Sequence, residues 1–524
     1  MTNNFRTFIL LSTALLAACN DPLSNNNPTD SDTGTTTISD TTYGNANDFL
    51  ENWDAFTSGD MRNIALTWTD DAVKIDGSYD GVTITADGTH IIIVSSTKKL
   101  QYTLAGSCQD GSIKIYSDYK FVLNFNGLTL HNPAGPAVNI QKGKTMEDDG
   151  GYPHKAVYVL LQSGTVNTLS DGSNYDQEVT IDAITEDQKA CFFSEGQLLL
   201  SGNGTLNITG NNRHAMRSDD YIRLRENITL NITANAEDAI NGNEYIIVDR
   251  GTHNLSVNAY KGKGLKADTI LIAGGETHIT CTSTTAEGIE ADYLTINDGL
   301  IECLAQDDGI NADKSIIING GYVFTHGTDN DGLDSNGTIT INGGVIVAIG
   351  TKTPEEGIDC DQNNFTITGG IVLGIGGASS TPTSNTTTQP TILYTGSCNA
   401  GTRLSLLDAD ANVILSYTPE TSLTQMTLLL TSPALTLNST YTLTSGGTYT
   451  ASTTSTTTSS PVITDFHNLT NTGSLTSATT LTTLSLSSVV TSAGNNGGGP
   501  GGGGNGGGNP GGGNQGGGGR PGGR

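Results

Sequence analysis

One short phrase returns seven times between His214 and Asp361, and this repetition limits the possible folds more than any other feature of the chain. It begins as HAMRSD at 214–219 and ends as EGIDCD at 356–361. The intervals between the central aliphatic residues of successive copies are 24, 25, 24, 21, 23 and 25 residues. A period of roughly 20–50 residues is typical of stacked architectures, in which each repeat is one structural unit. The central residues are Met216, Ile240, Leu265, Ile289, Ile310, Leu333 and Ile358.

Each repeat has the alternation of short β-strands. In EGIEAD (287–292), Ile289 and Ala291 fall on one face, while Glu290 and Asp292 point the other way. Two further strand-like runs follow at 293–297 and 300–305, separated by a turn. Glycine suits such turns because it adopts positive φ without steric cost. The expected turn glycines are Gly274-Gly275, Gly299, Gly320-Gly321, Gly343-Gly344 and Gly369-Gly370.

Strands this short cannot bury an apolar face alone, but stacked in parallel they form one continuous core. The sequence therefore predicts an all-β chain with a parallel β-helix, a solenoid, over 48–376. A β-sandwich does not impose identical phrases at this period. Residues 391–450 return to β-like alternation and are expected to form a small C-terminal β extension that caps the solenoid. Residues 451–524 are rich in Ser, Thr and then Gly, and predict a low-complexity, disordered tail.

The first residues resemble a bacterial lipoprotein signal peptide, 1–19. Arg6 precedes the apolar run 8–16, and Leu16-Ala17-Ala18-Cys19 resembles a lipobox. In lipoproteins the cysteine is acylated, which predicts that Cys19 anchors the chain at the outer membrane or cell surface, facing outward. An ordinary secretory signal with a chance cysteine is the alternative. The polar residues 20–47 are expected to be a flexible linker.

The net charge of −29 argues against a nucleic-acid partner, because phosphate binding requires clustered Lys and Arg. The same charge opposes contact with anionic lipid, so membrane association is expected through the lipid anchor only. The six cysteines after Cys19 are scattered, without CxxC or His at metal spacing, which argues against a zinc site. Buried free thiols are expected for most of them.

The repeats also align acidic residues in columns. Stacking places equivalent residues of successive repeats about 4.8 Å apart, so carboxylates face carboxylates from Ile289 to Ile358. Like charges in that arrangement are destabilising unless a cation neutralises them, and Ca²⁺ takes carboxylate and amide oxygens. The sequence predicts Ca²⁺ on this edge; a solvated edge of turn-forming acids is the alternative. The candidate ligands are Glu287, Glu290, Asp292, Asp307, Asp308, Asp313, Asp331, Asp334, Glu356, Asp359 and Asp361.

Several stretches together resemble a known family. They include FVLNFNGLTLHNPAGPAVNI at 121–140, ACFFSEGQLLLSGNGTLNITG at 190–210 and the DGINAD-type phrases. The resemblance covers roughly 68–376. It is to bacterial carbohydrate-binding-domain proteins with a right-handed parallel β-helix, described as lipoproteins that bind calcium and acidic plant polysaccharide. A pectin-like or polygalacturonate partner is what the resemblance implies.

Three functions remain open. The favoured one is calcium-dependent binding of an acidic polysaccharide at the cell surface, with Ca²⁺ bridging protein and sugar carboxylates and with no catalytic residue. A polysaccharide lyase is the first alternative, in which Lys266 beside Asp268, or Arg217 beside Asp219, acts as the base. The second alternative is a structural adhesin that calcium only rigidifies.

Overall fold

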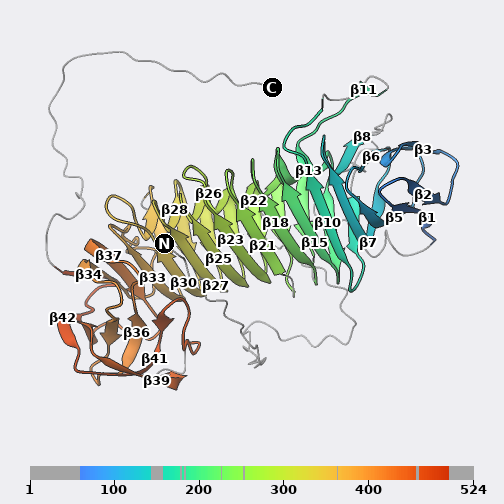
Figure 1. Cartoon of the computed structure of the whole chain (residues 1–524). Coiled ribbons are helices and arrows are strands. Elements are labelled where there is room, and N and C mark those ends of the chain that lie inside the picture. The colour runs from blue at the N-terminus through green and yellow to red at the C-terminus, as the bar shows by residue number, and fades with distance from the viewer. Residues whose placement is uncertain are drawn as a thin grey trace, which may run out of the picture. The chain divides into compact units, whose positions relative to one another are not determined.

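The computed structural model describes residues 60–142, 157–176, 180–181, 184–225, 227–251, 254–362, 364–455 and 460–494. All regular elements in these ranges are β-strands, and most form one parallel solenoid with three strands per turn (Figure 1). The predicted all-β parallel β-helix is therefore confirmed. The described ranges contain no helix long and apolar enough to cross a membrane. Cys19, the linker 20–47 and the Gly-rich end lie outside them.

Three ladders of parallel strands form the walls of the solenoid. The first ladder contains β4 (His90–Ser95), β6 (Ser112–Ser117), β8 (Val138–Lys142), β13 (Ala190–Ser194), β16 (His214–Ser218), β19 (Ile240–Gly242), β22 (Leu265–Ile272), β24 (Ile289–Ile296), β26 (Ile310–Ile318), β28 (Leu333–Ser335) and β31 (Ile358–Cys360). The second contains β1 (Arg62–Trp68), β5 (Leu100–Cys108), β7 (Phe121–Asn132), β9 (Val157–Leu161), β14 (Leu198–Gly202), β17 (Tyr221–Leu224), β20 (Tyr245–Val248), the second halves of β22, β24 and β26, β29 (Thr338–Ile341) and β32 (Asn364–Ile367). The third contains the end of β7, β10 (Val166–Asp171), β15 (Thr205–Gly210), β18 (Thr229–Ala234), β21 (Asn254–Ala259), β23 (Glu276–Cys281), β25 (Leu300–Ala305), β27 (Tyr322–Gly327), β30 (Val345–Ile349) and β33 (Ile371–Gly376).

Alternate residues of each strand fill the interior. In β15 and β18, the inward Leu206, Ile208, Leu230 and Ile232 are at most 1% exposed, and the residues between them lie on the outer face. Each side chain buried in this way stabilises the fold by about 1.5–3 kcal/mol before entropy is counted. The six cysteines of the described ranges are free and buried, as expected.

One glycine of each predicted turn has positive φ, whereas the first glycine of each Gly-Gly pair does not; the positive-φ glycines are Gly275, Gly299, Gly321, Gly344 and Gly370. Gly321 has φ of 84°, and a Cβ there would lie 2.7 Å from the carbonyl oxygen of Gly299 in the preceding turn. A side chain would therefore meet both an unfavourable backbone conformation and a backbone atom.

Short antiparallel elements flank the first turns of the solenoid. β2 (Val73–Asp76) pairs with β1, and β3 (Val82–Asp87) pairs with β4. A two-residue pair, β11 (Thr180–Ile181) and β12 (Ile184–Thr185), projects between β10 and β13.

The C-terminal strands reverse direction at the last turn of the solenoid. β37 (Leu423–Thr431) pairs antiparallel with β33 and with β34 (Thr391–Cys398), and β43 (Val490–Gly494) pairs with β34. A separate antiparallel sheet holds β40 (Leu469–Thr470), β36 (Val413–Tyr417), β35 (Leu404–Leu407), β38 (Thr440–Ser445) and β42 (Thr479–Ser485), and β39 (Thr448–Ser455) pairs with β41 (Thr472–Thr476). Strands therefore continue to Gly494, beyond the expected end at residue 450, because Thr-rich sequence supports exposed strands as well as disorder.

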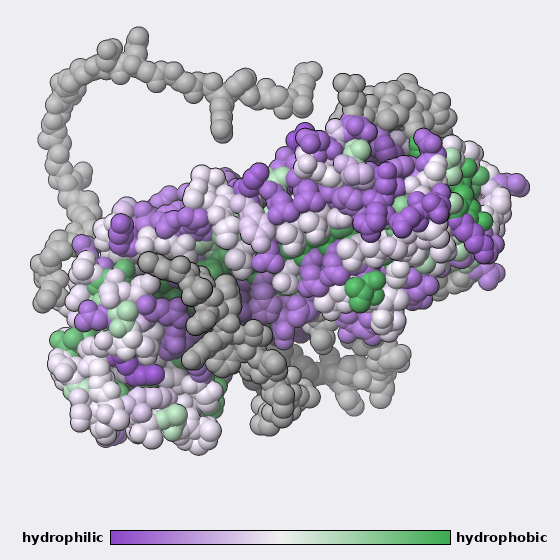
Figure 2. All heavy atoms as spheres, viewed as in Figure 1, coloured by the Kyte–Doolittle hydropathy of each residue, from purple (hydrophilic) through white to green (hydrophobic). Residues whose placement is uncertain are grey.

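These C-terminal strands pack against the outer face of the third ladder. His278, Glu302, Phe324, Val347 and Leu373 are paired residue to residue along that face, which changes from polar to apolar after Glu302. The apolar members lie in or against a second core formed with the C-terminal strands. Figure 2 shows hydrophilic residues in broad bands over the visible face of the solenoid.

A histidine in the turn before β40 borders this contact. The Nε2 atom of His467 lies 2.8 Å from Glu302 Oε1, and Nδ1 of His278 lies 2.7 Å from Glu302 Oε2. The ring of His467 stacks on Phe324 at 3.7 Å between centroids. Glu302 is thus shared by two histidines at the boundary of the contact.

Candidate functional site

The repeated phrase forms the first ladder, in the register expected from the sequence. The central aliphatic residues pair from strand to strand from Met216 to Ile358, and each is fully buried. The residue that follows each of them faces outward at the same height. The outward column is Arg217, Asn241, Lys266, Glu290, Asn311, Asp334 and Asp359.

Five predicted ligands gather in the last three turns of this ladder: Asp308, Asp331, Asp334, Glu356 and Asp359, named here the carboxylate cluster. One carboxylate oxygen from each of Asp331, Asp334 and Asp359 lies within 4.8 Å of the others. Two oxygens bound to one Ca²⁺ lie at most about 5 Å apart, because each Ca–O bond is about 2.3–2.6 Å. The three side chains are therefore close enough to share one ion.

Hydrogen bonds between turns fix these carboxylates. Asp308 Oδ1 accepts a bond from the backbone N–H of Asp331 at 3.0 Å, and Asp331 Oδ1 accepts one from the backbone N–H of Glu356. The amide of Asn311 donates to Asp308 at 3.1 Å and to Asp334 at 2.6 Å. Both carboxylate oxygens of Asp308 accept these bonds, whereas Asp331 uses only Oδ1 and Asp334 only Oδ2 in them.

Four carboxyl groups of the carboxylate cluster have a pKa above the ordinary value: Asp308, Asp331, Asp334 and Glu356. Burial raises the pKa of Asp308 to about 6 and that of Asp331 to about 7. Burial, with the negative charges of neighbouring carboxylates, raises the pKa of Asp334 and of Glu356 to about 8. Desolvation and like charge both disfavour the ionised form, and a bound cation would relieve both.

Glu356 adds an unsatisfied oxygen. Its Oε2 atom is buried and has no hydrogen-bond partner among the described residues. Leaving such an atom without a partner is unfavourable by about 1–3 kcal/mol or more when it is charged. A cation coordinated there would satisfy it.

Two predicted ligands lie elsewhere, among lysines. Lys263 Nζ is 3.1 Å from Glu287 Oε2 and also contacts Glu290, and Lys266 Nζ is 3.0 Å from Glu290 Oε1. The protein's own ammonium groups therefore neutralise Glu287 and Glu290. The proposed base Lys266 is paired with Glu290.

The remaining four predicted ligands lie outside the carboxylate cluster. Asp307 accepts a bond from Asn330 at 2.9 Å, and Asp313 accepts one from Asn336 at 3.1 Å on the exposed surface. Asp292 and Asp361 occupy the column two residues after Glu290 and Asp359. Asp307 acts electrostatically on Asp308, and Asp361 on Asp334, whereas Asp292 acts on Asp268.

Sequence reasoning missed Ser380. Its hydroxyl donates to Asp359 Oδ1 at 3.1 Å and accepts from the backbone N–H of Cys360 at 2.9 Å. Ser380 lies 22 residues after Ile358, so the repeat period points to it, although the phrase itself has ended. The serine hydroxyl supplies one more neutral oxygen at the end of the cluster.

Arg217, the other candidate base, is held by neighbours. Its Nε donates to Asp219 Oδ1 at 3.1 Å, and Nη1 donates to Asn241 Oδ1 at 2.9 Å. An arginine in this position is a structural cation of the ladder.

Comparisons with known proteins agree with the sequence resemblance. A family model described as carbohydrate-binding domain-containing protein matches residues 76–345, just over half of the chain. A protein of Acetivibrio thermocellus with the same description is 25% identical over 157 residues, which are 30% of this chain and 48% of that protein. The chain thus spans about half the length of that curated relative. Among solved structures, a polysaccharide lyase-like protein from C. thermocellum, studied as a gadolinium derivative, aligns with 54% of this chain and 93% of its own, at 19% identity and a TM-score of 0.35.

Proposed function

Because this chain belongs to the family of carbohydrate-binding domain-containing proteins, we propose that it binds an acidic polysaccharide with the help of Ca²⁺ held by the carboxylate cluster. The observation that supports this most is the convergence of Asp331, Asp334 and Asp359 within 4.8 Å. The donor set consists of oxygen atoms alone, which suits Ca²⁺ better than the transition metals that favour His or Cys.

Charge supports a calcium bridge. A protein of net charge −29 and a polyuronate chain repel one another, so direct contact is unfavourable without cations. Ca²⁺ accepts 6–8 oxygens, roughly twice as many as the three converging carboxylates supply with one atom each. Open coordination positions would accept a carboxylate of the polysaccharide, with polygalacturonate as the model ligand.

Equilibrium binding to polygalacturonate tests this proposal. Wild-type protein is expected to bind in the presence of Ca²⁺ and to lose binding in excess EDTA. The variant Asp331→Asn/Asp334→Asn is expected to lose binding in both conditions. Asp410→Asn, which removes an exposed carboxylate from the turn between β35 and β36, is the matched control. Equal affinity with and without EDTA would exclude the bridge, and calcium-stabilised protein that binds no glycan would indicate a structural adhesin.

A polysaccharide lyase is the second candidate. Burial and the neighbouring charge of Lys263 lower the pKa of Lys266, as general bases require. Its pairing with Glu290 at 3.0 Å opposes that role. Ultraviolet absorbance of unsaturated uronate products, formed by wild type and lost in Lys266→Met, would establish the lyase.

We also propose that the solenoid is displayed at the cell surface through acylated Cys19. Residues before 60 lie outside the described ranges, so the support is the lipobox-like sequence alone. Labelling with a radioactive fatty acid, present in wild type and absent in Cys19→Ala, tests the anchor.

A further inference from the structure

Every turn that carries the phrase contributes two side chains, three residues apart, to the same edge of the first ladder. The two belong together because Asp238 and Asn241 hydrogen-bond at 2.7 Å, and so do Asp308 and Asn311 at 3.1 Å. Contacts across turns join neighbouring pairs in both parts of the ladder, as between Lys263 and Glu287 and between Asn311 and Asp334. The seven pairs are His214/Arg217, Asp238/Asn241, Lys263/Lys266, Glu287/Glu290, Asp308/Asn311, Asp331/Asp334 and Glu356/Asp359.

The first four pairs alternate between basic and acidic. His214 Nδ1 lies 3.4 Å from Asp238 Oδ2 and accepts a bond from the backbone N–H of Asp238 at 3.1 Å. The next pair is basic, Lys263 and Lys266, and the one after it is acidic, Glu287 and Glu290. Each acidic pair in this part of the ladder therefore lies next to a basic pair.

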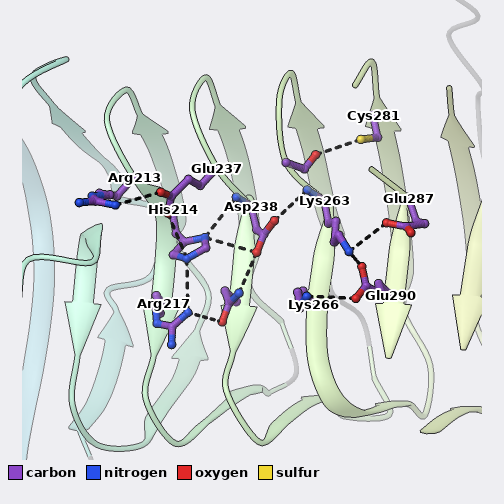
Figure 3. A network of polar contacts seen from close by, with 12 residues as sticks. Arg213, His214, Arg217, Glu237, Asp238, Lys263, Lys266, Cys281, Glu287 and Glu290 are labelled. Atoms are coloured by element: carbon purple, nitrogen blue, oxygen red, sulfur yellow. Dashed lines mark hydrogen bonds and ion pairs between the residues drawn. The ribbon is translucent and has the colours of Figure 1, made fainter. Parts of the chain in front are cut away.

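The lysine pair, Lys263 with Lys266, lies between two acidic turns (Figure 3). The backbone N–H of Lys263 donates to Asp238 Oδ1 at 2.9 Å, and its ammonium is 3.1 Å from Glu287 Oε2. The side chain of Lys263 is 19% exposed, and those of Glu287 and Glu290 are 17% and 23% exposed. This partial burial makes the charge contacts matter more than ion pairs on an open surface.

The last three pairs have no such partner. Among the described residues, no lysine or arginine forms an ion pair with the carboxylate cluster. The hydrogen bond to the next turn is the same in both parts of the ladder. Asp308 Oδ1 accepts the backbone N–H of Asp331, and Asp238 Oδ1 accepts the backbone N–H of Lys263. The same edge of the solenoid therefore contains basic side chains in its first four phrase-bearing turns and no lysine or arginine in its last three.

We infer that the lysine pair is an internal substitute for a bound metal ion and sets the N-terminal limit of the cation-binding edge. This inference rests on the proposed function, because it assigns cation binding to the turns beyond the lysines. Two ammonium groups carry the charge of one Ca²⁺ and contact the carboxylates of Glu287 and Glu290. The glutamate turn therefore needs no calcium, and removing the lysine charges would create one additional divalent-cation site there.

Calorimetric titration with Ca²⁺ alone tests the substitution. Lys263→Met/Lys266→Met keeps the aliphatic length and removes two charges, and it is expected to bind one Ca²⁺ more per chain than wild type. Its melting temperature should fall in EDTA and recover in Ca²⁺. Lys314→Met, at an exposed position of β26, is the matched control and should leave both values unchanged. An unchanged stoichiometry with a calcium-independent melting temperature would overturn the inference.

A second variant separates charge from packing. Adding Glu287→Gln/Glu290→Gln to the double lysine variant removes both signs of charge, so it should melt as wild type does in EDTA and bind no extra ion. If this variant is as unstable as the double lysine variant, the lysines act through packing and the inference is wrong. A wild type that binds no Ca²⁺ would refute the proposed function, while a site gained by the lysine variant would still support the substitution.

Discussion

Calcium affinity should depend steeply on pH, because the proposed ligands must lose protons to bind the ion. Asp334 gives the clearest case, since burial and neighbouring carboxylates raise its pKa to about 8. Such a group is about half ionised at pH 8 and about 1% ionised at pH 6. Its contribution alone should weaken calcium binding about fifty-fold between these pH values.

Calorimetry in two buffers with different ionisation enthalpies measures this effect. The difference in apparent heat gives the number of protons released per Ca²⁺, and at least one is expected at pH 7 from Asp334 and Glu356. Asp334→Asn should bind more weakly at pH 8 and show a shallower pH dependence. An affinity that is equal at pH 6 and pH 8, with no proton release, would refute the assignment of the cluster as the cation site.

The same raised pKa values make the stability of the calcium-free protein depend on pH. A carboxyl whose pKa is higher in the folded than in the unfolded chain stabilises the fold below its ordinary pKa, and this stabilisation is lost as the pH rises through the raised value. For Asp331, Asp334 and Glu356, that loss runs from about pH 4 to about pH 8. In EDTA the melting temperature should fall across this range, and Ca²⁺ should restore it at pH 8.

Three further predictions concern the scaffold. In thermal melts, His278→Gln should destabilise the protein more at pH 5.5 than at pH 8.5. Glu302 raises the pKa of His278, so the protonated histidine stabilises the fold, and this stabilisation is lost as the pH rises through the raised value. An equal effect at both pH values would contradict this. Arg223→Met should lower the free energy of unfolding, measured in urea, by about 3–5 kcal/mol. The reason is that Asp249, which is 6% exposed, loses the guanidinium 2.9 Å away. A loss below about 1 kcal/mol would mean that the ion pair does not stabilise the fold. Gly321→Ala should destabilise by more than about 1 kcal/mol through its positive φ, and an unchanged urea midpoint would show that the turn relaxes.

The repeat period made the first ladder predictable from sequence. Once Met216 and Ile358 are aligned with the copies between them, strand register and the outward column follow, because a one-residue shift would turn every apolar side chain outward. The earlier turns at Ile91, Ile113, Val138 and Phe192 belong to the same column but lack the acidic phrase. Periodicity in the phrase therefore revealed only part of the ladder.

The ion pairs were harder to predict. Aligning the repeats places Lys266 beside Glu290, but the alignment does not show whether flexible side chains of adjacent turns meet. Lys263, which also contacts the glutamates, lies in the turn three residues before Lys266. Eleven acids looked equivalent as ligands, while the structure brings five of them together without a lysine. Composition also hid the strands after residue 450, since Thr and Ser are compatible with either exposed strands or disorder.

The reversal of strand direction between β33 and β37 has a consequence for self-association. A parallel stack has two ends with open backbone groups, and each could accept a strand from another molecule, so that such solenoids would join end to end into fibres. An antiparallel strand at one end offers no matching surface for a further parallel turn. The C-terminal strands thus act as a terminator, and a chain that ends at Gly376 is expected to form elongated oligomers, detectable by light scattering, where the full chain stays at a defined size.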